Sequence, residues 1–283
     1  MKHSFIMVMD FYFSEVTGGA EANAECLLDR FIESGIPMVK MKSHEVTVEF
    51  LKNNKHKVFI FSNFILLKQE CRQYAINNLK YFVYEQDHKY IKSRNPIKYV
   101  NFVAPKEERV NIDFYKGAIR VLFLTKLSME VFHKNTDLTN LLNLQSSVWR
   151  KEELAYLRTI CNNEKDKRVA VMDSDNPIKR RNDCINLCRK NNWEYNLVKD
   201  SNFKKFLEKM SKHNKLLFLT GHLETCARIV VEAKMLNMKV ITNKKLIGAT
   251  SEEWYKLSGK QLIDKMEEIS SYMPTVILEA VGD

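Results

Sequence analysis

The strongest constraint in the sequence is an alternation of short apolar runs with longer amphipathic segments, which occurs twice along the chain. In the first half, strand-like runs at 4–10, 57–63, 81–87 and 118–125 alternate with helix-like segments at 20–34 and 65–78. Strands that alternate with helices of this length form parallel crossover units. The first half therefore predicts a doubly wound α/β domain.

The second half repeats the pattern after a break. Strand-like runs at 167–173, 194–200, 215–220 and 239–243 alternate with helix-like segments at 179–192, 203–213 and 224–238. Between the halves, the short run 141–144 is followed by QSSVWRKEEL, which fits neither pattern. We expect an α/β protein of two Rossmann-like doubly wound domains, 1–146 and 147–283, facing each other across a cleft, with packing of the C-terminal helix back on the first domain as an alternative. One or two closing helices, interrupted near Pro274, are expected at the end of the chain.

Composition agrees with a protein of two packed domains. The 283 residues are 45% hydrophobic and 28% charged, which is enough to bury a core and argues against wholesale disorder. The six cysteines show no CxxC pairs, and we interpret them as reduced thiols. No signal-peptide pattern opens the chain, and no apolar run approaches the ~18 residues of a membrane span. The sequence thus predicts a cytoplasmic protein, in the host cytoplasm if it is phage-encoded.

The net charge of +10 is unevenly distributed. Residues 51–100 and residues 201–250 each hold 10 Lys and Arg against 3 Asp and Glu. Both blocks favour an anionic neighbour such as nucleic acid. An excess of solvated surface lysine explains them equally well.

The segment TGHLETCARIVVEAKMLNMKVITN contains the most informative pattern. Glu224 is expected at the start of the helix that follows a strand, and Glu232 lies eight residues on, about 12 Å along the axis at ~1.5 Å per residue. A nucleotide-sugar has about this length, so one carboxylate can bind the sugar and the other the ribose. The helix-start amides of Thr225, Cys226 and Ala227 would then meet the diphosphate. Two surface glutamates are the alternative, although Glu232 lies among apolar residues and needs a partner.

Basic residues follow the strand-like run 167–173. Lys179, Arg180 and Arg181 are expected to open the next helix and to neutralise a leaving diphosphate. A basic helix face in solvent is the competing interpretation. In the first half, Gly18 and Gly19 lie between a strand and a helix, where backbone amides can approach a phosphate or sugar closely, although a plain tight turn explains them as well.

The stretch YEQDHKYIKSRNP follows a strand at the predicted ligand-binding edge of the first domain. Asp87 and His88 are catalytic candidates, since His88 can bond a sugar hydroxyl or stabilise an electron-poor anomeric centre. A lone histidine is more often structural. Lys89, Lys92 and Arg94 are expected to form a basic rim that binds nucleic acid.

Several enzyme classes are not supported. The sequence has no HExxH, GxSxG or GxxxxGK[ST] motif and no Cys/His zinc spacing. Metalloprotease, serine-hydrolase and P-loop interpretations therefore lack their motifs, and no metal site is expected.

With these motifs, the chain resembles the retaining GT-B glycosyltransferases of the glycosyl transferase group one family. The likeness consists of the GGAE turn at Gly18, Lys179 of NPIK, and the Glu224–Glu232 pair followed by EA and VITN. It implies a first domain that binds the acceptor and a second that binds a nucleotide-sugar co-substrate, a UDP-sugar, without a cofactor. It assigns Glu224 to the sugar, Glu232 to the ribose and Lys179 to the diphosphate. It also implies a front-side displacement with retention, in which the leaving phosphate helps to deprotonate the acceptor and neither a metal nor a protein nucleophile is needed.

The chain departs from the family pattern in two places. The family often has Pro and Gly after the first glutamate, where this chain continues with TCAR, ending at Arg228. The family also tends to place a second cation where this chain has Ser174. Either Arg180, Arg181 or Arg228 replaces that cation, or diphosphate binding is weaker.

The acceptor is suggested only indirectly. The chain has 24 Asn and 33 Lys, whose A-rich codons point to an AT-rich genome such as that of many phages. With the basic blocks, this favours 5-hydroxymethylcytosine in double-stranded phage DNA as the acceptor. The sugar is expected to be glucose or, as a resemblance to small viral transferases implies, a pentose such as arabinose. The alternatives are a glycosyltransferase of lipopolysaccharide or surface glycan synthesis and a non-catalytic DNA- or nucleotide-sugar-binding protein.

Overall fold

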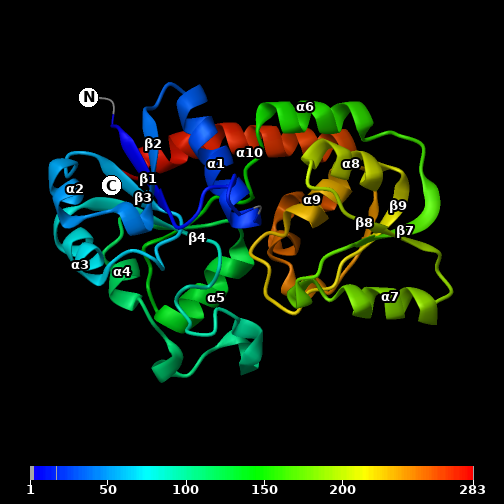
Figure 1. The fold of residues 1–283 in the computed structure, drawn as a ribbon, viewed down its shortest axis with the longest axis horizontal. Coiled ribbons are helices and arrows are strands. Elements are labelled where there is room, and N and C mark those ends of the chain that lie inside the picture. The colour runs from blue at the N-terminus through cyan, green and yellow to red at the C-terminus, as the bar shows by residue number, and fades with distance from the viewer. Residues whose placement is uncertain (1–2, 17, 283) are drawn as a thin grey trace. The chain divides into compact units, whose positions relative to one another are not determined.

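The computed structural model describes residues 3–16 and 18–282 and divides the chain into two α/β units (Figure 1). Unit 1 comprises residues 1–150 and 269–283, and unit 2 comprises residues 151–268. Each unit contains one parallel sheet with helices between the strands, as the sequence predicts. The expected boundary after residue 146 falls shortly before the first helix of unit 2.

Unit 1 is built on a six-stranded parallel sheet of order β2-β1-β3-β4-β5-β6. Its strands are β1 (Phe5–Met9), β2 (Met38–Lys42), β3 (Val58–Phe61), β4 (Lys80–Glu85), β5 (Val121–Phe123) and β6 (Leu141–Asn143). Its helices are α1 (Gly19–Glu33), α2 (Val48–Asn53), α3 (Gln69–Asn78), α4 (Ile112–Lys116) and α5 (Lys126–Thr136). Every residue of β1 and β3 is buried, because helices cover both faces of a parallel sheet and leave no face for polar side chains.

Unit 2 is built on a four-stranded parallel sheet of order β10-β9-β7-β8. Its strands are β7 (Asp166–Met172), β8 (Tyr195–Val198), β9 (His213–Leu217) and β10 (Lys239–Ile241). Its helices are α6 (Lys151–Ile160), α7 (Arg181–Lys190), α8 (Phe203–Ser211) and α9 (Arg228–Met235). Asn202 caps α8, since its side-chain oxygen accepts the amide of Lys205 at 3.1 Å.

Both sheets contain a point where the strand order reverses direction. In unit 1, β1 lies between β2 and β3, and in unit 2, β7 lies between β8 and β9. The crossover connections on the two sides of such a point diverge, so a crevice forms beyond the carboxyl ends of the central strands. The loops after β1 and β3 and the loops after β7 and β9 are therefore where each unit is best suited to bind a ligand.

The C-terminal helix corrects one prediction. α10 (Gly259–Glu279) runs through Pro274 without the expected interruption. Apolar side chains on both sides of the proline, including Met273 and Ile277, are buried, and their packing offsets the one hydrogen bond that proline cannot make. No helix among the described residues combines the length and the apolar character that crossing a membrane requires.

Asp10 holds the switch point of unit 1 together. It follows β1 and is almost completely buried. Its carboxylate accepts a short hydrogen bond from the Ser43 hydroxyl and bonds at 3.2 Å from the amides of Ile65 and Leu66. One side chain thus joins the loops that follow β1, β2 and β3.

We expect Asp10→Ala to lower the free energy of unfolding by about 3 kcal/mol, because several bonds to a buried carboxylate are lost together. Chemical denaturation measures the change. Asp113→Ala, at an exposed carboxylate of α4, serves as the control and should change it by less than about 1 kcal/mol. Equal effects of the two variants would contradict the role of Asp10.

Candidate functional site

The loops after β7 and β9 form the candidate site of unit 2. The two strands are hydrogen-bonded neighbours, so their carboxyl ends lie side by side. The Gly221 amide donates to the Ile178 carbonyl at 2.8 Å and ties one loop to the other. Residues far apart in the sequence are therefore brought together at the edge of the sheet where a ligand is expected.

Lys179 and Glu224 meet in this site. The Lys179 ammonium lies 2.8 Å from Glu224 Oε1, and the Thr220 hydroxyl donates to the same oxygen at 3.1 Å. The ammonium also lies 5.5 Å from the centre of the buried Phe218 ring. The side chains of Lys179 and Glu224 remain 25% and 16% exposed, so a ligand can reach both. The structure thus places two of the predicted donor residues in direct contact.

The prediction that a single helix runs from Glu224 to Glu232 is wrong. α9 begins only at Arg228, and Glu224 lies before it in extended backbone, bridged to Ile247. Ala227 is left-handed, with φ 62°, and this conformation separates the loop from the helix. Thr225, Cys226 and Ala227 accordingly precede the helix and are not its first amides, so the sequence-based estimate of the distance between the two glutamates does not apply.

Glu232 is buried inside unit 2 and pairs within its own helix. Its Oε1 lies 3.3 Å from Nε of Arg228, and the same guanidinium reaches Glu153 of α6 at 3.2 Å. The guanidinium carbon also lies 5.9 Å from the centre of the Phe203 ring. Arg228 is therefore the partner that the buried Glu232 carboxylate requires.

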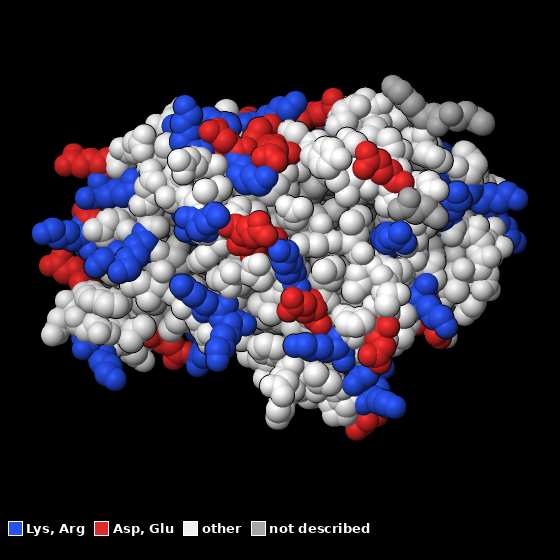
Figure 2. All heavy atoms as spheres, turned by 180° about the vertical axis from the view of Figure 1, so that it is seen from behind, with Lys and Arg blue, Asp and Glu red and all other residues white. Residues whose placement is uncertain are grey.

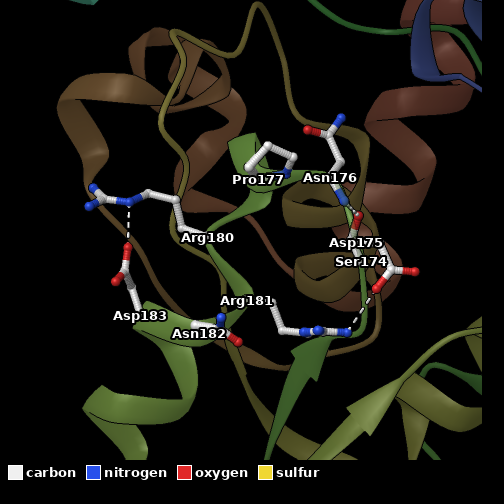
Figure 3. Close-up of a pocket in the computed structure, with 8 residues that line it drawn as sticks. All are labelled: Ser174, Asp175, Asn176, Pro177, Arg180, Arg181, Asn182 and Asp183. Carbon is white, nitrogen blue, oxygen red and sulfur yellow. Dashed lines mark hydrogen bonds and ion pairs between the residues drawn. The ribbon is translucent and has the colours of Figure 1, made fainter.

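The cations after β7 are arranged differently from the prediction. Lys179 ends the short 3-10 helix η5 (Pro177–Lys179), Arg180 is left-handed, and only Arg181 belongs to α7. Arg180 pairs with Asp183 at 2.5 Å, and Arg181 pairs with Asp173 at 2.6 Å. Figure 3 shows the guanidinium groups of Arg180 and Arg181 pointing in opposite directions, each toward an aspartate.

A cavity of about 310 Å³ opens beside these arginines (Figure 3). Its lining joins the loop after β7 to the first turn of α7 and consists of Ser174, Asp175, Asn176, Pro177, Arg180, Arg181, Asn182 and Asp183. A helix N-terminus with an adjacent guanidinium favours anions. Ser174, where the resembled family tends to have a cation, faces this cavity with Arg180 and Arg181 beside it.

In unit 1, the glycine pair lies at the start of α1. Gly18 is the N-cap in extended backbone, and Gly19 is the first helical residue. A Cβ at Gly18 would collide with the Glu21 carboxylate, whereas one at Gly19 would meet open space. Burial raises the pKa of Glu21, and the nearby carboxylates of Asp87 and Asp10 raise it further. The turn therefore brings an acidic side chain, rather than only backbone amides, to the switch point.

Asp87 and His88 lie in the connection after β4, but only Asp87 is accessible. The Asp87 side chain is 35% exposed, whereas His88 is 1% exposed and its Nδ1 lies 3.0 Å from the Tyr90 hydroxyl. His88 is also left-handed, with φ 55°. This environment favours a structural role for His88, so the acceptor hypothesis now depends mainly on Asp87.

Lys89 corrects the predicted basic rim. Its side chain is completely buried, with the ammonium 3.5 Å from Glu85 Oε1 and 3.9 Å from Asp87 Oδ2. It lies beside the Phe64 ring and has no hydrogen-bond partner among the described residues. A buried ammonium of this kind cannot contact a nucleic-acid phosphate, so its assignment to the rim is wrong.

Glu85 is the anchor of this region and was missed by sequence reasoning. Its Oε1 accepts the backbone amides of Asp87 at 2.8 Å and Lys89 at 3.3 Å, and its Oε2 accepts a short bond from Tyr115. Burial would raise the pKa of Glu85, but Lys89 and the Tyr115 hydroxyl outweigh burial and hold that pKa below its usual range. The sequence offered one indication of this role, since Glu85 stands at the end of an apolar, strand-like run.

The other predicted rim residues remain accessible. Lys92 is exposed and lies 4.0 Å from Glu108, and Arg94 is half-buried. On the face shown in Figure 2, Lys and Arg side chains alternate with Asp and Glu rather than forming one continuous basic area. Over the described ranges, no group of three or more His, Cys, Asp and Glu side chains could hold a metal ion.

Comparison with solved structures identifies the fold. HepE from Anabaena in complex with UDP aligns with a TM-score of 0.54 and 11% identity, over 98% of this chain and 92% of HepE. The lipopolysaccharide outer core galactosyltransferase WaaB aligns with a TM-score of 0.52 and 10% identity, over 98% of this chain and 94% of WaaB. A glycosyltransferase from Rickettsia africae aligns with a TM-score of 0.50 and 11% identity, over 99% and 93%.

These likenesses extend over almost the whole chain and confirm the predicted GT-B fold. At the level of sequence, no protein-family model and no curated protein matches the chain.

We expect Arg228→Met to lower the free energy of unfolding by about 3 kcal/mol, because it leaves Glu232 buried without its guanidinium. Arg228→Met with Glu232→Met should recover much of this loss, and chemical denaturation measures both. Arg158→Met is the control, since the Arg158–Asp264 pair is more exposed and should contribute at most about 1 kcal/mol. A double variant no more stable than the single one would contradict this account.

Glu85 should make the stability of the protein depend on pH. A depressed pKa in the folded state contributes stability above the unfolded pKa of about 4.3, and the contribution disappears as the pH falls through the folded value. Glu85→Gln should therefore cost about 3 kcal/mol at neutral pH and progressively less below about pH 4. Denaturation midpoints measured across acidic pH test this, with the exposed Glu107→Gln as control. A constant difference between wild type and Glu85→Gln would disprove it.

Proposed function

We propose that this protein is a glycosyltransferase that uses a UDP-sugar bound to unit 2. The observation that carries the proposal is the Lys179–Glu224 contact at the strand-order reversal of β7 and β9. A cation that can meet a diphosphate and a carboxylate that can accept sugar hydroxyl bonds stand together where an α/β sheet binds ligands. HepE, which has the same fold, is described in complex with UDP and glucose.

The chemistry follows from the charges. As the bond between the sugar and the phosphate breaks, negative charge grows on the diphosphate, and Lys179 is 25% exposed and able to meet it. Glu224, positioned by the buried Thr220 hydroxyl, then orients the sugar, and the α7 N-terminus with Arg180 supports the phosphates. Glu232 is proposed to hold the ribose. We also propose that the reaction retains the configuration at the anomeric carbon and needs no metal. In this mechanism the departing phosphate takes the proton from the acceptor hydroxyl.

For the acceptor, Asp87 of unit 1 is the proposed contact. Hydroxymethylcytosine in DNA stays the favoured hypothesis from the sequence, although the burial of Lys89 removes one of its expected phosphate contacts. A surface glycan is supported by WaaB, which has the same fold and is described as a lipopolysaccharide outer core galactosyltransferase. Both acceptors present a hydroxyl group to the same activated sugar.

One assay tests the proposal and separates the acceptors. The protein is incubated with labelled UDP-glucose or UDP-arabinose and with hydroxymethylcytosine duplex, unmodified duplex or lipid-linked glycan. Label on one acceptor alone identifies it. UDP binding without transfer to any acceptor would favour a nucleotide-sugar-binding protein, and the absence of UDP binding would refute the proposal.

Substitutions then test the individual roles. Lys179→Met should weaken UDP binding at least about tenfold, since a charged hydrogen bond to phosphate is lost. Glu224→Gln should mainly lower turnover, and Glu232→Gln should mainly weaken donor binding. Lys209→Met is the matched control, because Lys209 makes a similar exposed pair with Asp200 at 2.9 Å, outside the site. Calorimetry with UDP measures affinity, and equal effects of the Lys179 and Lys209 variants would refute the placement.

A further inference from the structure

A long connection between β4 and α4 leaves the sheet of unit 1 and returns to it. Figure 1 shows it as the blue-green segment that extends past α5. Its base is closed by an antiparallel bridge between Ile91 and Arg109, and the Lys92 amide donates to the Glu108 carbonyl at 2.9 Å. We call residues 93–107 the Val100 loop. Connections of this length without strands or long helices are usually functional.

The Val100 loop has a defined shape, because α5 holds it from inside. The buried side chain of Asn135 accepts the Ala104 amide at 2.8 Å and donates to the Phe102 carbonyl at 2.8 Å. Arg109 donates to the Ala104 carbonyl at 3.0 Å, and Tyr99 packs against the core of unit 1. These contacts fix both sides of the tip and determine which side chains point outward.

The tip presents apolar side chains to solvent. Val100 is 85% exposed, the highest value among the large apolar side chains of the described residues, and Val103 is 36% exposed. Between them, Asn101 and Phe102 are left-handed, with φ 53° and 65°. Left-handed backbone costs roughly 1 kcal/mol or more for a residue with a Cβ. Two consecutive left-handed residues hold Val100 and Val103 outward, which makes the tip a candidate for a contact outside the chain.

Lysines flank these valines. Lys98 and Lys106 are both exposed, on either side of Val100 and Val103, with Lys92 at the base. Lysine stems lie along an apolar surface while their ammonium groups reach outward. Aliphatic side chains with a lysine before and after them in the chain match the boundary between acyl chains and anionic headgroups, although the exposed Glu107 follows Lys106.

We propose that residues 98–106 dock on an anionic phospholipid surface, with Val100 and Val103 entering the headgroup region and Lys98 and Lys106 meeting lipid phosphates. Nucleic acid fits less well, because valine offers no ring on which a base can stack. Two lysines are also fewer than the roughly six to ten phosphate contacts of a typical DNA-binding surface. The loop begins in the same connection as Asp87, so docking would place a membrane-borne acceptor near unit 1; this last point depends on the proposed function.

Sedimentation of the full chain with vesicles tests the proposal, without donor or acceptor. Binding is expected to vesicles of phosphatidylcholine mixed with phosphatidylglycerol, to be weaker with phosphatidylcholine alone, and to fall with added salt. Val100→Ser should reduce partitioning about tenfold through lost apolar contact. Lys98→Gln and Lys106→Gln should each reduce it about fivefold.

Matched variants separate the tip from general surface effects. Val39→Ser changes another valine of unit 1, 56% exposed on the edge strand β2, and should leave partitioning unchanged. Lys116→Gln and Lys134→Gln remove exposed lysines elsewhere on unit 1 and should have much smaller effects. Equal losses in the tip and control variants would overturn the proposal, because partitioning would then reflect net charge alone.

Two further readouts complete the test. Binding to duplex DNA is measured with the same variants. If the wild-type protein does not bind vesicles, and the tip variants lose DNA binding, the loop binds nucleic acid and the proposal is overturned. UDP affinity is measured alongside and should be unchanged by Val100→Ser. A protein that partitions through Val100 but binds no UDP would support the docking surface and refute the proposed function, so the two failures are distinguishable.

Discussion

Parallel pairing of β7 with β9 is the constraint on which the candidate site depends. Lys179 and Glu224 are separated by 45 positions, and they meet only because their loops leave the same edge of adjacent strands. The register from Val169↔Lys215 to Val171↔Leu217 sets where each strand ends, and the Gly221 bond to Ile178 then brings the loops together. A strand inserted between β7 and β9 would leave the same residues unable to touch.

Charged side chains hold the binding edge of each unit in a similar way. In unit 1, Asp10 and Glu85 accept backbone amides from loops that have no regular structure of their own. In unit 2, Arg228 joins Glu232 to Glu153 of α6. Buried carboxylates that accept several bonds fix loop geometry more firmly than surface pairs can, because leaving a buried acceptor without its partners costs more free energy than leaving an exposed one.

The sequence was sufficient for the fold because the apolar runs are long and clearly alternate. The strands expected at 57–63 and 194–200 match β3 and β8, and the helix expected at 20–34 matches α1. Errors arose where a few residues decide the geometry. The left-handed Ala227 interrupts the predicted helix between Glu224 and Glu232. The hydrophobic periodicity of a sequence does not reveal such a conformation.

Burial of charged residues was the second source of error. Lys89 stands in a hydrophilic stretch beside Lys92, and nothing in that stretch distinguishes a buried lysine from an exposed one. The difference comes from Glu85, which lies four positions earlier at the end of a buried strand and pairs with the ammonium. Thr220 was overlooked for a related reason, since its role requires the loop to fold back onto Glu224.

The position of Arg228 also decides which residue can replace the cation that the resembled family tends to have at the position of Ser174. Arg228 bonds Glu232 and Glu153, and moving it to a diphosphate would leave two carboxylates together without their shared guanidinium. Arg181 is held by Asp173, whereas Arg180 is half exposed and, within the part of the chain that the structure describes, pairs with Asp183 three positions later. Glu232 is 3% exposed, so the proposed ribose contact requires its remaining acceptor positions to become accessible while Arg228 stays bound. Arg180 is therefore the cation that we propose for the phosphates, and Arg228 is the one that we propose to orient Glu232.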